Sequence, residues 1–145
     1  IYHMAFGNGG SDVLNTGEIN YKTTNTGTIR DDSAGLYNKT YEKLIGQSAS
    51  TDSKNNVSIV TSSSSYTDLQ ITCTLDFGEP STQTTSDTAT SDSSTDFIFD
   101  ELGIYAYNSG GISQEYLLTH VIFHPVQKSL NRVIEIVYTI RVQLQ

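Results

Sequence analysis

The clearest pattern of apolar and polar positions lies near the C-terminal end of the sequence, in residues 133–144. Apolar or aromatic residues occupy every second position there, and largely polar residues lie between them. Successive side chains of a strand point to opposite faces, so this period of two predicts a β-strand with one buried face. The apolar positions are Ile134, Ile136, Tyr138, Ile140, Val142 and Leu144.

A second strand is predicted over residues 66–77, where the apolar positions again alternate with polar ones. Its apolar face consists of Leu69, Ile71, Cys73, Leu75 and Phe77. We interpret Cys73 as a small core residue rather than a reactive thiol, because no basic residue lies beside it. Residues 57–61 are predicted to form a short strand, which we expect to pair with this strand across residues 62–65.

Residues 97–107 and 116–124 are two further strand-like segments. Asn108-Ser109-Gly110-Gly111 lies between them and tolerates positive φ, so we predict a hairpin. Pro125 is expected to end the second of these strands, and residues 125–132 are expected to form a hairpin loop that leads into the last strand.

Two segments do not follow these alternating patterns. In residues 33–45 the apolar positions have helical spacing but also suit a strand, so we expect a short helix or a strand. In residues 81–95, eleven of fifteen residues are Ser or Thr, and none has a large apolar side chain. We expect a flexible loop there, because the segment cannot bury enough surface to offset its ordering entropy. Whether it has a role or is only an inserted surface loop stays open.

These elements predict an all-β fold, a mostly antiparallel β-sandwich with at most one short helix. The length of 145 residues corresponds to one domain, which we place at residues 1–145 with 81–95 as its long Ser/Thr-rich loop. Strands with one strongly apolar face need either full closure of their sheet or a second sheet to cover them. Gly103 in mid-strand predicts a bulge or the close approach of another backbone. Val133 and Val137, on the polar face of the last strand, indicate either a subunit contact or a covering loop.

Composition and charge narrow the possible partners. Eight Lys and Arg against sixteen Asp and Glu give a formal net charge of −8. This balance argues against nucleic acid and against an anionic membrane surface, both of which need clustered basic residues. No apolar run approaches the roughly 20 residues of a membrane-spanning helix, and no signal-peptide pattern is visible at the start. The single cysteine excludes an internal disulfide and a zinc cluster of thiolates.

Candidate chemistry in the sequence is weak. His120 and His124 would lie about 13 Å apart on a strand, too far to share one metal ion, so we expect half-buried or interface histidines. An acidic run contains the five residues Asp87, Asp92, Asp96, Asp100 and Glu101. It lacks the EF-hand spacing, so a solvated loop end is favoured over a cation site. No Gly-x-Ser-x-Gly motif occurs. We therefore assign no catalytic, cofactor-binding or metal-binding residue and expect a protein that is not an enzyme, although a spatial pair of carboxylates stays open.

Four pieces of the chain form a recognisable series. They are Tyr2-His3-Met4-Ala5-Phe6-Gly7-Asn8-Gly9-Gly10, Leu36-Tyr37-Asn38-Lys39-Thr40-Tyr41, residues 97–106 (FIFDELGIYA) and the closing strands. In this order they resemble the anchoring domain of tailed-phage tail-collar fibre proteins. That family has a Met-Ala-x-Gly-x-Gly turn, a Leu-x-Asn-Glu-x-Tyr stretch and an Arg-Glu-Ile-Gly-Leu strand. Here Lys39 stands at the position of the Glu in the stretch, and Asp100 at that of the Arg.

The resemblance implies a non-enzymatic structural subunit of a tailed-phage virion, assembled in the bacterial host cytoplasm and located at the tail, collar or baseplate. It implies other virion proteins as partners and a homo-oligomer, for which a trimer is one arrangement. A capsid decoration or cement protein is an alternative within this class. A carbohydrate- or receptor-binding module is a further alternative, which the nine Tyr favour and the absence of Trp weakens.

Overall fold

The computed structural model describes residues 1, 3–25, 35–46, 53–80, 97–108 and 114–143, and these fold into nine strands. The strands are β1 (His3–Gly7), β2 (Ser11–Val13), β3 (Ile19–Tyr21), β4 (Lys39–Leu44), β5 (Asn55–Ser62), β6 (Tyr66–Leu75), β7 (Phe97–Asn108), β8 (Gln114–Lys128) and β9 (Ile134–Gln143). No helix among the described residues has the length and apolar character that crossing a membrane requires. The Ser/Thr-rich segment 81–95 and residues 109–111 of the expected turn lie outside these ranges.

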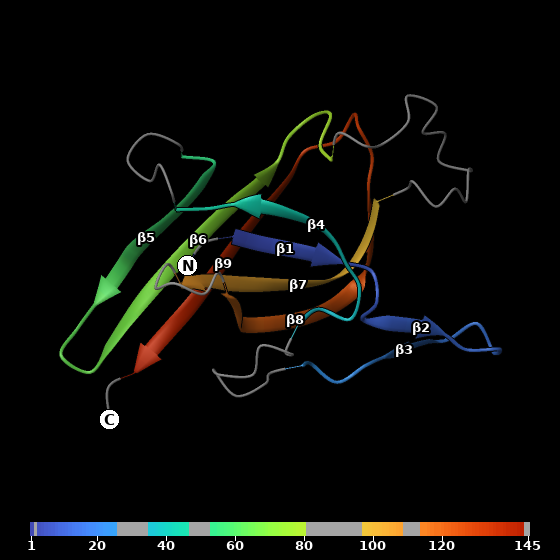
Figure 1. Cartoon of the computed structure of the whole chain (residues 1–145), viewed down its shortest axis with the longest axis horizontal. Helices are drawn as coiled ribbons and strands as arrows, with labels where there is room; N and C mark the ends of the chain where they lie inside the picture. Colours follow the sequence, from blue (N-terminus) through green and yellow to red (C-terminus); the bar gives the residue numbers. More distant parts are fainter. Residues whose placement is uncertain (2, 26–34, 47–52, 81–96, 109–113, 144–145) are drawn as a thin grey trace.

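Two sheets form the layers of the fold, and their strands cross obliquely in Figure 1. The larger sheet has the strand order β4-β1-β7-β8, and the smaller has the order β5-β6-β9. Each pairing in these described sheets is antiparallel. A short hairpin of β2 and β3 extends from one end of the larger sheet (Figure 1). The predicted all-β, mostly antiparallel sandwich is confirmed.

The smaller sheet joins the segments with the strongest alternating patterns. Strand β6 lies in the middle and pairs with β9 from Tyr66 opposite Gln143 to Leu75 opposite Ile134. Directly opposed residues share a face of a sheet, so the apolar faces of the two strands become one surface. The predicted pairing of β5 with β6 is also confirmed.

The predicted hairpin of β7 and β8 is present, but β8 does not end at Pro125. It continues to Lys128, and its pairing with β7 is irregular between Phe99 and Glu101. Strand β8 also lies at the edge of its sheet. Proline lacks an N–H group and is tolerated at such bulges and edges, which is why it does not terminate the strand.

Two further expectations about connections are resolved by the sheet order. The expected hairpin between the strands now numbered β8 and β9 is wrong, since β8 pairs with β7 and β9 pairs with β6 in the other layer. Alternation along a strand specifies a buried face but not which strand lies beside it. Of the segment expected as a short helix or strand, residues 39–44 form strand β4.

The core lies between the two sheets and draws its side chains from both. Its buried members are Met4, Phe6, Ile45, Ile71, Cys73, Leu75, Phe99, Leu102 and Ile104. The rings of Phe6 and Phe99 lie 5.1 Å apart between centroids. The expected core position of Phe77 is wrong, because β6 ends at Leu75 and the Phe77 side chain is 67% exposed.

The smaller sheet is buried unevenly along its length. Ile71 of the central strand β6 is fully buried. Ile59 of the neighbouring strand β5 lies opposite Leu69 of the apolar face, yet its side chain is 67% exposed. Substitution of Ile71 by Ala is therefore expected to lower the free energy of unfolding by about 2–5 kcal/mol, as cavity-forming substitutions do. The matched substitution Ile59→Ala removes the same atoms from an exposed site and should cost less than about 1 kcal/mol. Urea denaturation of both variants checks this, and equal losses would contradict the placement of the core.

Candidate functional site

The outer face of the larger sheet, which points away from the core, carries two clusters of polar side chains. His3 and Ala5 of β1 lie on this face because they alternate with Met4 and Phe6, which face the core. Leu36, just before β4, packs over this face against a small apolar group formed by Ala5, Tyr105 and Leu117.

Glu101 of β7 is the centre of this face. Its side chain is fully buried, and its carboxylate accepts four hydrogen bonds. Oε1 accepts the backbone N–H groups of Gly9 (3.1 Å) and Asn38 (2.9 Å). Oε2 accepts the backbone N–H of Tyr37 (3.0 Å) and contacts Nε2 of His120 (2.9 Å). This carboxylate therefore joins three segments that are far apart in the sequence.

His120 of β8 connects Glu101 to a fourth segment. The backbone N–H of Asn25 donates to Nδ1 of His120 at 2.7 Å, so Nδ1 carries no proton. Nε2 must then carry a proton, and this N–H donates a hydrogen bond to Glu101 Oε2. The imidazole acts as a bridge between a backbone amide and a buried carboxylate, which fixes its tautomer.

Asp100 fixes the turn that follows β1. Oδ1 accepts the backbone N–H of Gly10 at 2.9 Å, and Oδ2 accepts both the N–H (2.8 Å) and the hydroxyl (2.6 Å) of Ser11. Asp100 and Glu101 are both buried. The expectation that they belong to a solvated loop end is therefore wrong. The other members of the acidic run, Asp87, Asp92 and Asp96, lie outside the described residues.

Gly7 and Gly103 lie where the outer face of the larger sheet is tightly packed. A Cβ at Gly7 would lie 2.5 Å from the carbonyl oxygen of Asn38 and would press against the Glu101 carboxylate. A Cβ at Gly103 would lie 2.7 Å from Leu117 Cδ1 and 3.0 Å from Leu36 Cδ2. The close approach predicted at Gly103 is thus to side chains rather than to another backbone.

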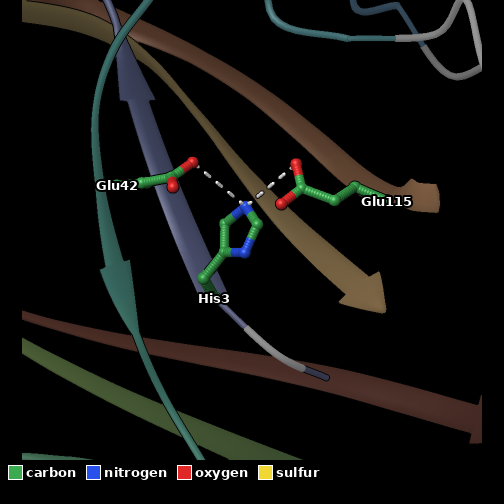
Figure 2. Close-up of side chains that lie close together, drawn as sticks. All are labelled: His3, Glu42 and Glu115. Atoms are coloured by element: carbon green, nitrogen blue, oxygen red, sulfur yellow. Dashed lines mark ion pairs between the residues drawn. The ribbon is translucent and has the colours of Figure 1, made fainter. Parts of the chain in front are cut away.

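A second polar cluster lies on the same face, near the start of β1. Figure 2 shows His3 of β1 pointing between Glu42 of β4 and Glu115 of β8. Nε2 of His3 lies 3.6 Å from Glu42 Oε2 and 3.7 Å from Glu115 Oε2. The His3 ring is buried and stacks on Tyr105, with the ring centroids 5.0 Å apart. One imidazole and two carboxylates, with donor atoms within 4.8 Å of one another, form a candidate metal centre.

Lys39 of β4 lies beside this cluster. Its ammonium contacts Glu42 Oε2 at 2.8 Å and Glu115 Oε2 at 3.5 Å. The hydrogen bond from Lys39 lowers the pKa of Glu42, while burial lowers the pKa of His3. At neutral pH these shifts favour an ionised carboxylate and a neutral imidazole, the forms in which both groups bind metal ions.

The two histidines that the sequence analysis examined as a possible metal pair lie in different surroundings. His120 is buried in the Glu101 network, whereas His124 is exposed, with its Nδ1 3.1 Å from the Tyr21 hydroxyl. Sequence reasoning missed His3, Glu42 and Glu115. They lie on three strands that are distant in the sequence, and no local motif signals that they meet.

Comparison of the chain with protein-family models, with curated proteins and with solved structures finds no match in any of the three.

Replacing Glu101 by Gln is expected to lower the free energy of unfolding by about 2–4 kcal/mol. The glutamine amide has only one acceptor oxygen. Its NH₂ group would face N–H donors, with which it cannot form hydrogen bonds. Glu18→Gln is a matched control, because Glu18 is exposed and its loss should change stability by less than about 0.5 kcal/mol. Urea denaturation measures both. A Glu101→Gln protein as stable as the control would contradict the bridging role.

Cys73 is fully buried, as expected from its position on the apolar face, and burial raises the pKa of its thiol to about 12. Since the thiolate is the reactive form, the folded protein should not react with Ellman's reagent at pH 8. Unfolding in urea should release one reactive thiol per chain, measured by absorbance. Rapid reaction of the folded protein would contradict this placement.

Proposed function

We propose that this chain is a non-enzymatic structural subunit of a tailed-phage virion, at the tail, collar or baseplate, and that it assembles with a second copy through strand β9. The observation that carries the proposal is the outer edge of β9, which no described strand covers. An edge strand presents a row of backbone N–H and C=O groups that are available to another strand.

Strand β9 is suited to this role by its length and position. It contains ten residues and ends the order β5-β6-β9, and no other strand among the described residues pairs with it. Val133 and Val137 are 43% and 54% exposed, so no loop among the described residues buries them. A long edge strand of this kind is a template for pairing with a strand of another chain.

The sequence of β9 is complementary to itself in an antiparallel register centred on Tyr138. In this register Glu135 lies opposite Arg141 of the second copy, and Val137 lies opposite Thr139, each twice because of the two-fold symmetry. The core-facing residues also oppose one another, so the apolar faces of the two sheets continue. A register shifted by one residue would place the core-facing residues of one copy opposite the outward-facing residues of the other. Shifts by two residues would keep the faces but separate Glu135 from the opposite arginine.

Within one chain, Arg141 is held against the neighbouring strand β6. Its Nε and Nη2 atoms donate to the two carboxylate oxygens of Asp68 at 2.7 and 2.9 Å, and its guanidinium lies 4.2 Å from the centre of the Tyr66 ring. A guanidinium has five N–H donors, so donors remain for a carboxylate of the second copy. An immobilised side chain also loses less entropy when the copies associate.

The Glu101 network supports placing the subunit in a virion. The short motifs that resemble the tail-collar anchoring domain are scattered along the sequence, yet the Glu101 carboxylate binds both Gly9 of the first motif and Asn38 of the second. Glu101 itself belongs to the third. Residues that match a family pattern by chance have no reason to meet, so this convergence favours a shared structural unit.

The same network supports a role other than catalysis. Glu101, Asp100 and His120 are buried acid and base groups, and each is engaged in holding backbone segments. Such groups serve as catalytic residues when they face a substrate site. Here their hydrogen bonds are directed to the protein's own chain.

Light scattering of the purified chain tests the assembly. We expect a dimer of the 15.9 kDa chain. The double substitution Val137→Lys and Thr139→Lys, at exposed positions, should give a folded monomer because four ammonium groups would meet at the symmetry axis. Ser58→Lys, on the exposed part of the opposite edge strand β5, is the control and should leave the dimer intact. A monomeric parent protein, or a dimer unaffected by the two lysines, would overturn assembly through β9.

Mass spectrometry of purified virions tests the location. In a phage that encodes this chain, its peptides should be present in the assembled particle in fixed proportion to the other structural proteins. Peptides confined to the soluble lysate would overturn a virion location. Glycan binding by the isolated chain would instead support the carbohydrate-binding alternative.

A further inference from the structure

A binding site for a metal ion is the strongest unassigned feature of the structure. We propose that His3, Glu42 and Glu115 bind one Zn²⁺ ion, with water as the fourth ligand. The three side chains come from β1, β4 and β8 and converge on one point of the outer face of the larger sheet (Figure 2). This site is independent of the proposed structural role and of the β9 edge.

The distances within the cluster suit coordination better than hydrogen bonding. Nε2 of His3 lies 3.6 and 3.7 Å from the nearest oxygens of the two glutamates, beyond hydrogen-bond length. Ligands around tetrahedral Zn²⁺, at bonds of about 2.0–2.1 Å, are separated by about 3.3 Å. Small movements of the two carboxylates would therefore place all three donor atoms around one ion.

The surroundings combine a fixed ligand with two adjustable ones. The His3 ring is buried and held against Tyr105, so its direction is set by packing. The side chains of Glu42 and Glu115 are 51% and 35% exposed, which leaves the carboxylates room to adjust and gives an ion access from solvent. A directed imidazole of this kind contributes to affinity because little of its freedom is lost on binding.

The donor set selects the class of ion. One imidazole nitrogen and two carboxylate oxygens suit Zn²⁺ and similar transition metals. Ca²⁺ takes six to eight oxygen ligands, and Mg²⁺ requires near-octahedral oxygen geometry. Neither ion is expected to bind here with comparable affinity.

The Lys39 ammonium competes with a metal ion for the carboxylates of Glu42 and Glu115. It neutralises the same two carboxylate oxygens that would bind zinc, at 2.8 and 3.5 Å. The Lys39 side chain is 39% exposed, so it can move into solvent when a divalent ion takes its place. Removal of the Lys39 ammonium should therefore strengthen the binding of zinc.

Calorimetric titration of the tag-free full chain with Zn²⁺ tests the proposal. We expect one ion per chain, and a weakening of more than about tenfold in each of Glu42→Gln and Glu115→Gln. Lys39→Met should tighten binding by about two- to fivefold, since an exposed ion pair is lost from the metal-free state. Co²⁺ in place of Zn²⁺ should give the visible absorption of a tetrahedral site, which both glutamine variants should lose.

Two variants elsewhere are the controls. His124→Gln and Glu18→Gln remove an exposed imidazole and an exposed carboxylate outside the cluster, and both should bind zinc as the parent protein does. His3 is left unchanged in this series because its burial makes misfolding a competing explanation. Zinc affinity that survives both glutamine substitutions in the cluster, falls in His124→Gln, or weakens in Lys39→Met would overturn the site.

Discussion

The buried carboxylate of Glu101 is the constraint on which the outer face of the larger sheet depends. A carboxylate removed from water is strongly destabilising unless hydrogen bonds replace its hydration. Glu101 obtains these bonds from three backbone amides and one imidazole, and no Lys or Arg contacts it in the described structure. The segments that carry these donors can take few other positions, because any departure would leave a buried charge without partners.

This constraint explains why irregular segments lie on a regular sheet. The turn after β1 and residues 37–38 before β4 have no strand partners of their own at these points, and their amides would otherwise need water. Asp100 and Glu101 satisfy those amides directly. The sheet therefore positions its loops through charged side chains, whereas the core between the two sheets consists mainly of apolar residues.

The two layers consequently offer different surfaces. The outer face of the larger sheet combines the Glu101 network with the His3 cluster, and its polar groups are directed by strands β1, β4, β7 and β8. The smaller sheet has a simpler chemistry, with alternating apolar and polar residues and a long edge at β9. Groups that converge on a point favour ligand binding, and an open strand edge favours association.

The sequence by itself determined the fold class, the buried faces of β6 and β9 and the core position of Cys73. Each follows from a period of two, which depends only on local backbone geometry. Neighbouring turn residues likewise predicted the β7–β8 hairpin. Only the tertiary structure decided that β8 and β9 belong to different layers, that Glu101 is a buried bridge rather than a solvated acid, and that His3 meets Glu42 and Glu115. These features depend on residues separated by up to about a hundred positions in the chain. The alternation of apolar and polar residues predicts which face of a strand a side chain occupies. The contacts of that side chain depend on the packing of the whole chain.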